Sequence, residues 1–341
     1  MNLQQKWDGE NWMRDYAPKI GDRPLSELRI PGTHDAGTFS IPKQGAVIAT
    51  AQKDAGTAQF AGVPEDFILG TQVTQNRTFT EQFDDGIRYI DFRLVCDPEG
   101  MFIVHTFRGM PIDEALAEIG SWADAHPHEV IFFDVQKNYG CDQQTYVSTD
   151  GRSRTGDVAF AELVRETFGS KLAPRPTSSA IAVTLNSLVS AGTNIVPFFI
   201  NQEVARQSDL WWFRACNALP EDAGMTNIWN PYITMPEMFQ FLLAEAPKYD
   251  QRCPSELLLG AIATSPMFPK DTGIAKWYSD WKAGTQVGSL REFIETTVLP
   301  DMPTMVAELS RAGYNVLSTD FYDLGKWPDG ISFAQLVVDQ N

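Results

Sequence analysis

Two histidines are the side chains in this sequence best suited to acid–base chemistry. The 341-residue chain has four histidines. His34 follows the apolar run LRIPGT and His105 follows FIV, so each stands at the end of an expected strand. An imidazole titrates near neutral pH, so one can take a proton from an attacking hydroxyl while the other protonates the leaving oxygen. We interpret His126 and His128, in the polar stretch AHPHE, as exposed loop residues at the opposite end of the molecule, although their spacing could bind a metal.

Charged side chains follow the same kind of apolar run. Asp35 is next to His34, the run IRYIDFR carries Asp91 and Arg93, and NVLSTD ends in Asp320. An arginine is a forked, permanently charged donor to phosphate oxygens. A carboxylate behind an imidazole fixes its tautomer and supports the imidazolium. Each residue alone could equally be structural, but their joint position at strand ends predicts one site that acts on a phosphate ester.

Short apolar runs and helical patterns alternate along the whole chain. We expect strands at 28–31, 87–94, 102–105, 130–136, 194–200, 257–264 and 315–319, and helices at 113–125, 157–168, 236–246, 289–297 and 302–312. The nearly continuous apolar strands are typical of a parallel sheet buried on both faces. The alternation predicts an α/β fold, either a barrel or a doubly wound sheet. In a barrel the strand C-termini meet on one face, which would bring His34 and Asp320 together.

The bulk properties exclude some classes of function. The length permits about two domains, although single α/β barrels of roughly 250 residues with insertions are common. A net charge of −17 argues against a nucleic-acid partner and against a polybasic grip on anionic lipid. No stretch approaches the roughly 20 apolar residues that cross a bilayer, and the start has no secretion-signal pattern. The compartment stays open between a secreted mature form and a cytoplasmic protein.

Four cysteines are scattered along the chain without a CxxC pair: Cys96, Cys141, Cys216 and Cys253. We expect reduced core thiols, with two disulfides as the alternative. The stretch 41–75 is rich in Ala, Gly, Gln and Thr, and predicts a long excursion of the lid or binding-loop kind.

Five stretches together resemble a known family: LRIPGTHDAGT, QFDDGIRYIDFRL, FIVHTFRG, ADAHPHEVIFFDVQKNYG and NVLSTDFYDLG. In order and spacing they are similar to the catalytic X domain of phosphatidylinositol-specific phospholipases C, over about 24–324. The resemblance is greatest to X-domain-only proteins and to metal-independent bacterial enzymes. It implies a distorted (β/α)8 barrel of the TIM type, in a single catalytic domain 1–341 with its core at 24–324 and the excursion at 41–75.

The resemblance also implies a role for each matching residue. His34 corresponds to the general base that deprotonates the inositol 2-hydroxyl, and His105 to the general acid that protonates the diacylglycerol oxygen. Arg93 corresponds to the group that stabilises the phosphoryl charge. Three carboxylates support them: Asp35 beside the arginine and the acid histidine, Asp91 in the same strand, and Asp320 behind the base histidine. The implied product is a 1,2-cyclic inositol phosphate.

Asp35 and Arg93 bear on metal dependence. Calcium-requiring relatives have Asn after the first histidine and an acidic residue at the position of Arg93. Calcium prefers six to eight oxygen ligands, and an arginine removes a ligand and puts a positive charge in the place of the ion. We therefore expect no metal and no other cofactor.

The head-group pocket departs from the family pattern. Gln136 stands where the family has lysine, and Lys137 would face away unless the strand end bends. Asn201 replaces a basic residue, and Trp229 and Asn230 stand near an expected Asp. These five residues are our candidates for substrate binding.

Two alternatives remain: a metal-dependent glycerophosphodiester phosphodiesterase, which Arg93 disfavours, and a catalytically weak phosphoinositide-binding protein, which the altered pocket favours. The expected partner is a phospholipid substrate at a membrane surface, contacted transiently by a monomer. Aromatic residues cluster in LWWF (Trp211, Trp212, Phe213) and KWYSDW (Trp277, Tyr278, Trp281), and we interpret them either as core packing or as a rim that touches the membrane.

Overall fold

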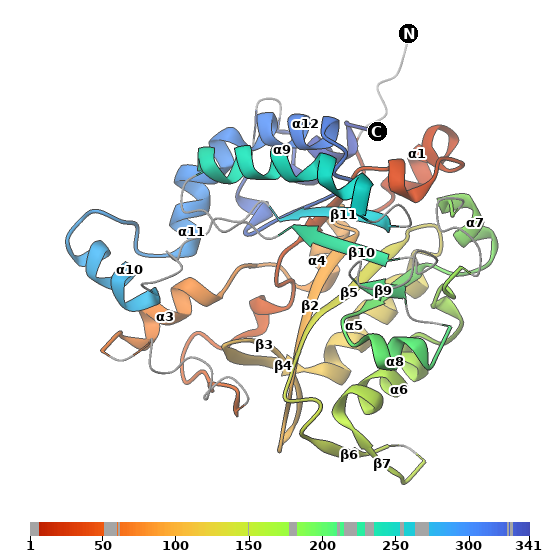
Figure 1. Cartoon of the computed structure of the whole chain (residues 1–341), viewed down its shortest axis with the longest axis horizontal. Coiled ribbons are helices and arrows are strands. Elements are labelled where there is room, and N and C mark those ends of the chain that lie inside the picture. The colour runs from red at the N-terminus through yellow and green to blue at the C-terminus, as the bar shows by residue number, and fades with distance from the viewer. Residues whose placement is uncertain are drawn as a thin grey trace.

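Helices and strands alternate along the chain, and the expected α/β class is confirmed (Figure 1). The computed structural model describes residues 7–50, 60, 62–148, 150–176, 183–209, 212–214, 224–228, 235–252, 256–262, 273–325, 327 and 330–341. No helix within these ranges has both the length and the apolar character needed to cross a membrane.

A ten-stranded sheet forms the centre of the fold. Its strands are β1 (Ile30–Thr33), β2 (Tyr89–Asp97), β3 (Gly100–His105), β4 (Phe107–Pro111), β5 (Ile131–Tyr139), β8 (Ile195–Phe199), β9 (Trp212–Arg214), β10 (Gly224–Ile228), β11 (Glu256–Ile262) and β12 (Val316–Thr319). Their spatial order is β1-β12-β11-β10-β9-β8-β5-β2-β3-β4, and β1 also pairs with β2. All these pairings are parallel except those of β3 with β2 and β4. A separate small sheet holds β6 (Thr145–Val147) and β7 (Ser153–Thr155).

The two faces of β2 pack against two different apolar clusters. Ile90 and Phe92 join the apolar cluster that also contains residues of the surrounding helices. Tyr89, on the other side of the strand, joins a second apolar cluster. Asp91 and Arg93 lie on the same side as Tyr89, because strand side chains alternate with a period of two. Both faces of β2 are therefore buried, although Asp91 and Arg93 interrupt its apolar residues.

Helices surround the sheet (Figure 1). They are α1 (Trp12–Ile20), α3 (Glu65–Gln72), α4 (Phe79–Asp84), α5 (Ile112–Ala125), α6 (Gly156–Phe168), α7 (Leu185–Ser190), α8 (Gln202–Arg206), α9 (Met235–Arg252), α10 (Gly273–Lys282), α11 (Leu290–Phe293), α12 (Met302–Arg311) and α13 (Phe333–Val338). The five predicted helices are present, the one at 289–297 as α11 followed by a π-helix at Ile294–Val298. The excursion at 41–75 contains α3, and residues 51–59 and 61 of it lie outside the described residues.

A disulfide joins Cys96 to Cys141, so the expectation of reduced thiols was wrong for this pair. Cys96 lies near the end of β2 and Cys141 just after β5, and these two strands pair side by side. Their Cα atoms are 4.8 Å apart, within the range that a disulfide can span. Cys216 and Cys253 lie outside the described residues.

The loop between α5 and β5 carries the other two histidines. His126 stacks on Trp122 with ring centroids 4.0 Å apart, and its Nε2 atom lies 2.8 Å from a carboxylate oxygen of Glu10. His128 is exposed, as predicted. His126 is more enclosed than predicted, because the indole of Trp122 covers one face of its ring.

Candidate active site

The six predicted catalytic residues lie together, four of them at or directly after strand ends and two within β2. His34 and Asp35 follow β1, Asp91 and Arg93 lie within β2, His105 ends β3, and Asp320 follows β12. The side chains of His34, Asp35, Asp91, Arg93 and Asp320 are at most 7 % exposed, and that of His105 is 24 % exposed. His105 therefore has the greatest access to solvent among the six.

His34 is held at both ring nitrogens. Its Nδ1 atom lies 2.8 Å from Oδ1 of Asp320, and its Nε2 atom lies 2.8 Å from Nη2 of Arg93. The carboxylate can only accept and the guanidinium can only donate, so Nδ1 carries the proton and Nε2 accepts the bond from Arg93. Burial alone would lower the pKa of His34, but the carboxylates of Asp35 and Asp320 outweigh it and raise the pKa above its usual value.

Arg93 lies at the centre of the cluster. Its guanidinium forms an ion pair with Asp35, and Nη2 donates to Asp91 at 3.0 Å and to Oε1 of Gln136 at 2.9 Å. Burial alone would lower the pKa of Arg93, but Asp35 and Asp91 raise it further above its usual range. For the carboxylate of Asp35, burial alone would raise the pKa. The positive charge of Arg93 and the two histidines outweigh burial and hold the pKa of Asp35 below its usual value. The site therefore contains a permanent positive charge.

The rings of His105 and His34 lie edge to face, with centroids 6.4 Å apart. Its Nδ1 atom lies 2.6 Å from the backbone oxygen of Gln72 and 3.4 Å from Oδ2 of Asp35. Burial lowers the pKa of His105, and Arg93 and His34 lower it further against the opposing effect of Asp35, so the pKa lies below its usual value. The carbonyl of Gln72 can only accept, so Nδ1 carries a proton and Nε2 is left for proton transfer.

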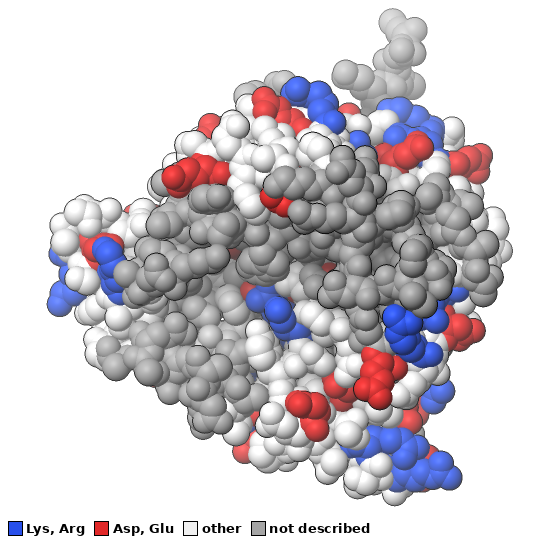
Figure 2. Space-filling view, in the orientation of Figure 1, with Lys and Arg blue, Asp and Glu red and all other residues white. Residues whose placement is uncertain are grey.

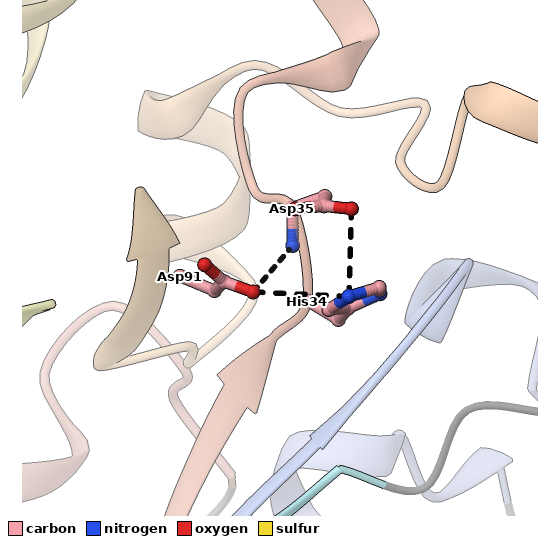
Figure 3. Close-up of side chains that lie close together, drawn as sticks. All are labelled: His34, Asp35 and Asp91. Atoms are coloured by element: carbon pink, nitrogen blue, oxygen red, sulfur yellow. Dashed lines mark hydrogen bonds and ion pairs between the residues drawn. The ribbon is translucent and has the colours of Figure 1, made fainter. Parts of the chain in front are cut away.

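Three of these residues also have the geometry of a metal site (Figure 3). One ligand atom each of His34, Asp35 and Asp91 lies within 4.8 Å of the others. Arg93 already donates to His34 and Asp91 and forms an ion pair with Asp35. A divalent cation among these ligands would have to displace a bound guanidinium.

A bulge changes the direction of the end of β5. Phe92 pairs with Val135, but the next residue of β2, Arg93, pairs with Lys137. Gln136 is the extra residue, and it is fully buried against Arg93. The register after the bulge puts Lys137 on the side of the sheet that Arg93 occupies. From the sequence, Lys137 could face the site only if the strand end bends, and this bulge is such a bend.

The other head-group candidates are bonded around the start of α8 or lie outside the described part. The side-chain amide of Asn201 donates to Asp157 at 2.7 Å, and its oxygen caps α8 by accepting from the backbone of Glu203 and Val204. The side chain of Asn201 is therefore committed to structure around the start of α8. Trp229 and Asn230 lie outside the described residues.

Residues 72–75 contact the site and were not identified from the sequence. The backbone of Gln72 bonds to His105, and the side chains of Thr74 and Gln75 bond to the backbone oxygen of His34. The sequence signal was only a run rich in Gln and Thr at the end of the excursion. Residue type does not indicate a role that a backbone carbonyl performs.

Comparison with known proteins gives a consistent set of relatives. No protein-family model matches the chain. Human PI-PLC X domain-containing protein 2 is 28 % identical over 193 residues, covering 55 % of this chain and 59 % of that protein. Human PI-PLC X domain-containing protein 3 is 24 % identical over 341 residues, covering 97 % of this chain and 94 % of that protein. The chain is related to the PI-PLC X domain-containing proteins, although the match spans only about three fifths of the first of these.

Two solved bacterial structures share the fold. A phosphatidylinositol-specific phospholipase C from Staphylococcus aureus superposes with a TM-score of 0.60 at 14 % identity, covering 98 % of both chains. The enzyme of the same name from Listeria monocytogenes gives a TM-score of 0.59 at 16 % identity, covering 98 % of this chain and 99 % of that one. Together with the curated relatives, these structures confirm the resemblance to the X-domain family.

Proposed function

We propose that this chain is a metal-independent phosphodiesterase that cleaves phosphatidylinositol-type lipids into diacylglycerol and a 1,2-cyclic inositol phosphate. The observation that carries the proposal is that the rings of His34 and His105 lie with centroids 6.4 Å apart, each with a nitrogen 3.4 Å from Oδ2 of Asp35, whose carboxylate also pairs with Arg93. One histidine has Nε2 as a proton acceptor, and the other has Nε2 placed for proton transfer. A phosphodiester between them would have a base on one side, an acid on the other and a guanidinium beside its oxygens.

The reaction needs two proton transfers and no water in its first step. Nε2 of His34 takes the proton of the inositol 2-hydroxyl, which replaces Arg93 as the donor to that nitrogen. The hydroxyl oxygen bonds to phosphorus while the bond from phosphorus to the diacylglycerol oxygen breaks. Nε2 of His105 gives its proton to that leaving oxygen. A slower second step opens the ring with water, and the histidines exchange roles.

The surrounding charges adjust the two histidines to these roles. Asp320 supports the imidazolium that forms when His34 takes a proton. The pKa of His105 is lowered in the free protein, and an acid must be protonated before it can react. A bound phosphodiester brings a negative charge next to His105, which raises its pKa towards the protonated form. Arg93 then stabilises the charge that develops on the phosphoryl oxygens.

Gln136 and Lys137 are the residues we propose for the head group. The Nε2 atom of Gln136 is buried and has no acceptor among the described residues, while its Oε1 is held by Arg93. This orientation leaves an amide donor beside the reacting phosphate. Asn201, Trp229 and Asn230 remain candidates for contact with the far side of the head group, although Asn201 would first have to release its cap of α8.

The membrane partner is supported by a cluster that we call the aromatic lobe, made of Phe67 on α3 and Trp277, Tyr278 and Trp281 on α10. Both helices lie together at one edge of the molecule (Figure 1). Trp277 is buried in this packing, whereas Trp281 is 44 % exposed. Interfacial tryptophans favour the head-group layer of a bilayer. Trp212, of the other aromatic cluster, is fully buried and belongs to the core.

We expect the contact with lipid to be transient and to be made by a monomer. The net charge of −17 opposes an electrostatic grip on anionic lipid. On the face shown in Figure 2, the acidic and basic side chains of the described residues are interspersed, without a basic stripe. The attraction to a membrane is then mainly apolar.

We also infer that residues 1–341 form one catalytic domain on a distorted (β/α)8 barrel, with its core at 24–324. The support is the pairing of β1 with both β12 and β2, which joins the two ends of a row of eight parallel strands. In such a barrel, the C-terminal strand ends form the active face.

Two rivals predict different results. A metal-dependent glycerophosphodiester phosphodiesterase would need a cation among His34, Asp35 and Asp91, where Arg93 already lies. A catalytically weak phosphoinositide-binding protein is favoured by the capping role of Asn201, because it removes one polar contact from the head-group pocket. That protein would bind lipid with little turnover.

The test is a phosphorus-NMR assay of vesicles containing phosphatidylinositol, with and without EDTA. We expect a cyclic phosphodiester signal that EDTA does not change. His34→Ala and His105→Ala should each lower turnover by roughly 10²–10⁴, whereas His128→Ala, an exposed histidine away from the site, should leave it unchanged. Loss of activity in EDTA with recovery in calcium would favour the first rival. Binding without a cyclic product would favour the second.

A further inference from the structure

The residues directly after α3 contact three of the strand ends that carry the acid–base groups. We call Gln72–Gln75 the positioning segment. It bonds to His105 at the end of β3, to His34 after β1, and to the backbone on both sides of Asp320 after β12. These contacts are buried, since Gln72 is 6 % exposed and Gln75 is fully enclosed.

The His105 side of the segment is built around Gln72. The backbone oxygen of Gln72 accepts from Nδ1 of His105 at 2.6 Å, and its side-chain oxygen accepts from the hydroxyl of Thr106 at 2.8 Å. The remaining amide group of Gln72 donates to Thr71 at 2.9 Å. Gln72 therefore holds both the ring of His105 and the residue that follows it.

Thr106 needs such a partner. Its φ of 64° is in the left-handed region, which a β-branched residue rarely adopts. Strained backbone of this kind persists only where the surroundings impose it. The hydroxyl bond to Gln72 is one of the contacts that hold the turn, and the turn determines where the ring of His105 lies.

The His34 side is built around Gln75. Its Nε2 atom donates to the backbone oxygen of His34 at 3.0 Å and to that of Thr319 at 2.9 Å. A single amide thus joins the end of β1 to the end of β12, next to Asp320. The hydroxyl of Thr74 also donates to the oxygen of His34 at 3.0 Å, and its backbone oxygen accepts from Phe321 at 2.7 Å.

The turns on this side have the same unusual backbone. Asp35 has φ 46° and Phe321 has φ 45°, both left-handed. Each directly follows a member of the His34–Asp320 pair, just as Thr106 follows His105. Among the described residues, Asp35, Thr106 and Phe321 are the three residues other than glycine that have a left-handed backbone. Each of them forms a hydrogen bond with the positioning segment.

We propose that Gln72 and Gln75 are positioning residues of the proposed phosphodiesterase, Gln72 for His105 and Gln75 for His34. Gln72 keeps the proton of neutral His105 on Nδ1 and so directs Nε2 to the leaving oxygen. Gln75 keeps His34 in line with Asp320 by joining their two strands. The inference rests on the proposed function for its catalytic meaning, but the geometry of the two rings can be measured without turnover.

The experiment compares Gln72→Met and Gln75→Met with Gln143→Met, an exposed glutamine away from the site. Nitrogen-15 NMR of the imidazoles reports the tautomer and pKa of each histidine. Gln72→Met keeps the backbone oxygen that accepts from Nδ1 but removes the side-chain bond that holds Thr106, so we expect it to displace the ring of His105 and change the His105 signals, while those of His34 stay nearly unchanged. Gln75→Met should do the reverse. Gln143→Met should change neither.

Turnover gives the second readout. A misplaced acid or base affects the transition state more than binding, so we expect kcat to fall roughly 10–100-fold in each variant, with little change in KM. If Gln72→Met does not fold, Thr106→Val removes the same hydrogen bond, and Thr106→Ser should restore the His105 signals and kcat. For Gln75→Met, the second substitution is Gln75→Glu, which keeps the shape and leaves at most one donor, the O–H of a protonated carboxyl, in place of the two N–H groups of the amide.

Two results would overturn the proposal. One is a loss of thermal stability in Gln72→Met or Gln75→Met with unchanged histidine signals, since that describes a purely structural residue. The other is an unchanged kcat in an active enzyme. A wild-type protein that cleaves no phosphatidylinositol would refute the proposed function instead, and the NMR comparison would still decide whether the segment positions the histidines.

Discussion

Replacing Arg93 by methionine should separate the two tasks of the guanidinium, which are to balance buried charge and to stabilise the phosphoryl group. The side chains of Asp35 and Asp91 are fully enclosed, and both are paired with Arg93. Removing one partner of a buried ion pair typically costs about 3–5 kcal/mol, because the remaining charge is left uncompensated. Loss of one preorganised donor at the reacting oxygens lowers turnover by roughly 10²–10³. We expect both effects in Arg93→Met.

The stability loss should depend on pH in a defined direction. Arg93 is the largest of the charges that hold the pKa of Asp35 below its usual value, so that this carboxylate contributes stability above its unfolded pKa and loses it at acidic pH. Without Arg93, burial raises the pKa of Asp35. A protonated, neutral Asp35 needs no counter-charge, so the destabilisation of Arg93→Met should shrink as the pH falls.

Urea unfolding at several pH values and turnover on phosphatidylinositol vesicles measure the two effects separately. The double variant Arg93→Met with Asp35→Asn should recover part of the stability but none of the turnover. Arg93→Lys keeps the charge but not the fork, so it should be nearly as stable as wild type and still slow. Wild-type turnover in Arg93→Met would refute the role at phosphate, and an undiminished unfolding free energy at neutral pH would refute the charge balance.

Three further predictions concern other parts of the molecule. In an NMR titration, His34 should titrate above about 6.5 and His105 below it, and the reverse order would contradict the roles of the surrounding charges. Replacing Cys96 and Cys141 by serine opens a loop with a sequence separation of 45 residues. Urea unfolding should then show a free energy of unfolding lower by roughly 4 kcal/mol. An unchanged free energy of unfolding would mean that the disulfide does not stabilise the fold. Trp281→Ala should weaken sedimentation with neutral vesicles roughly tenfold without affecting turnover of a soluble substrate, and unchanged binding would exclude the aromatic lobe as the contact.

The sequence was most informative where an apolar run stops. His34, Arg93, His105 and Asp320 each stand at or near the end of such a run, and strand ends of a parallel sheet share one edge. Their assembly could therefore be predicted without knowledge of the strand order. The meeting of His34 and Asp320 follows from the same reasoning, and the pairing of β1 with β12 brings them together.

Features that depend on strand pairing could not be predicted in this way. The disulfide needs β2 and β5 to be neighbours, and four scattered cysteines do not reveal which strands adjoin. The bulge at Gln136 is a register shift between the same two strands, and Lys137 would have been assigned to the wrong face without it. Gln72 acts on His105 through a backbone oxygen, which every residue type possesses.

The cross-link between Cys96 and Cys141 affects how the folded chain opens. Proteins open locally in cooperative units, and strands separate before their amides exchange with water. β2 and β5 cannot part at their joined ends while the covalent bond is intact. We therefore expect the amides around Asp91, Arg93 and Gln136 to be among the slowest to exchange hydrogen for deuterium. The charged centre of the site would then keep its arrangement through fluctuations that open other parts of the sheet.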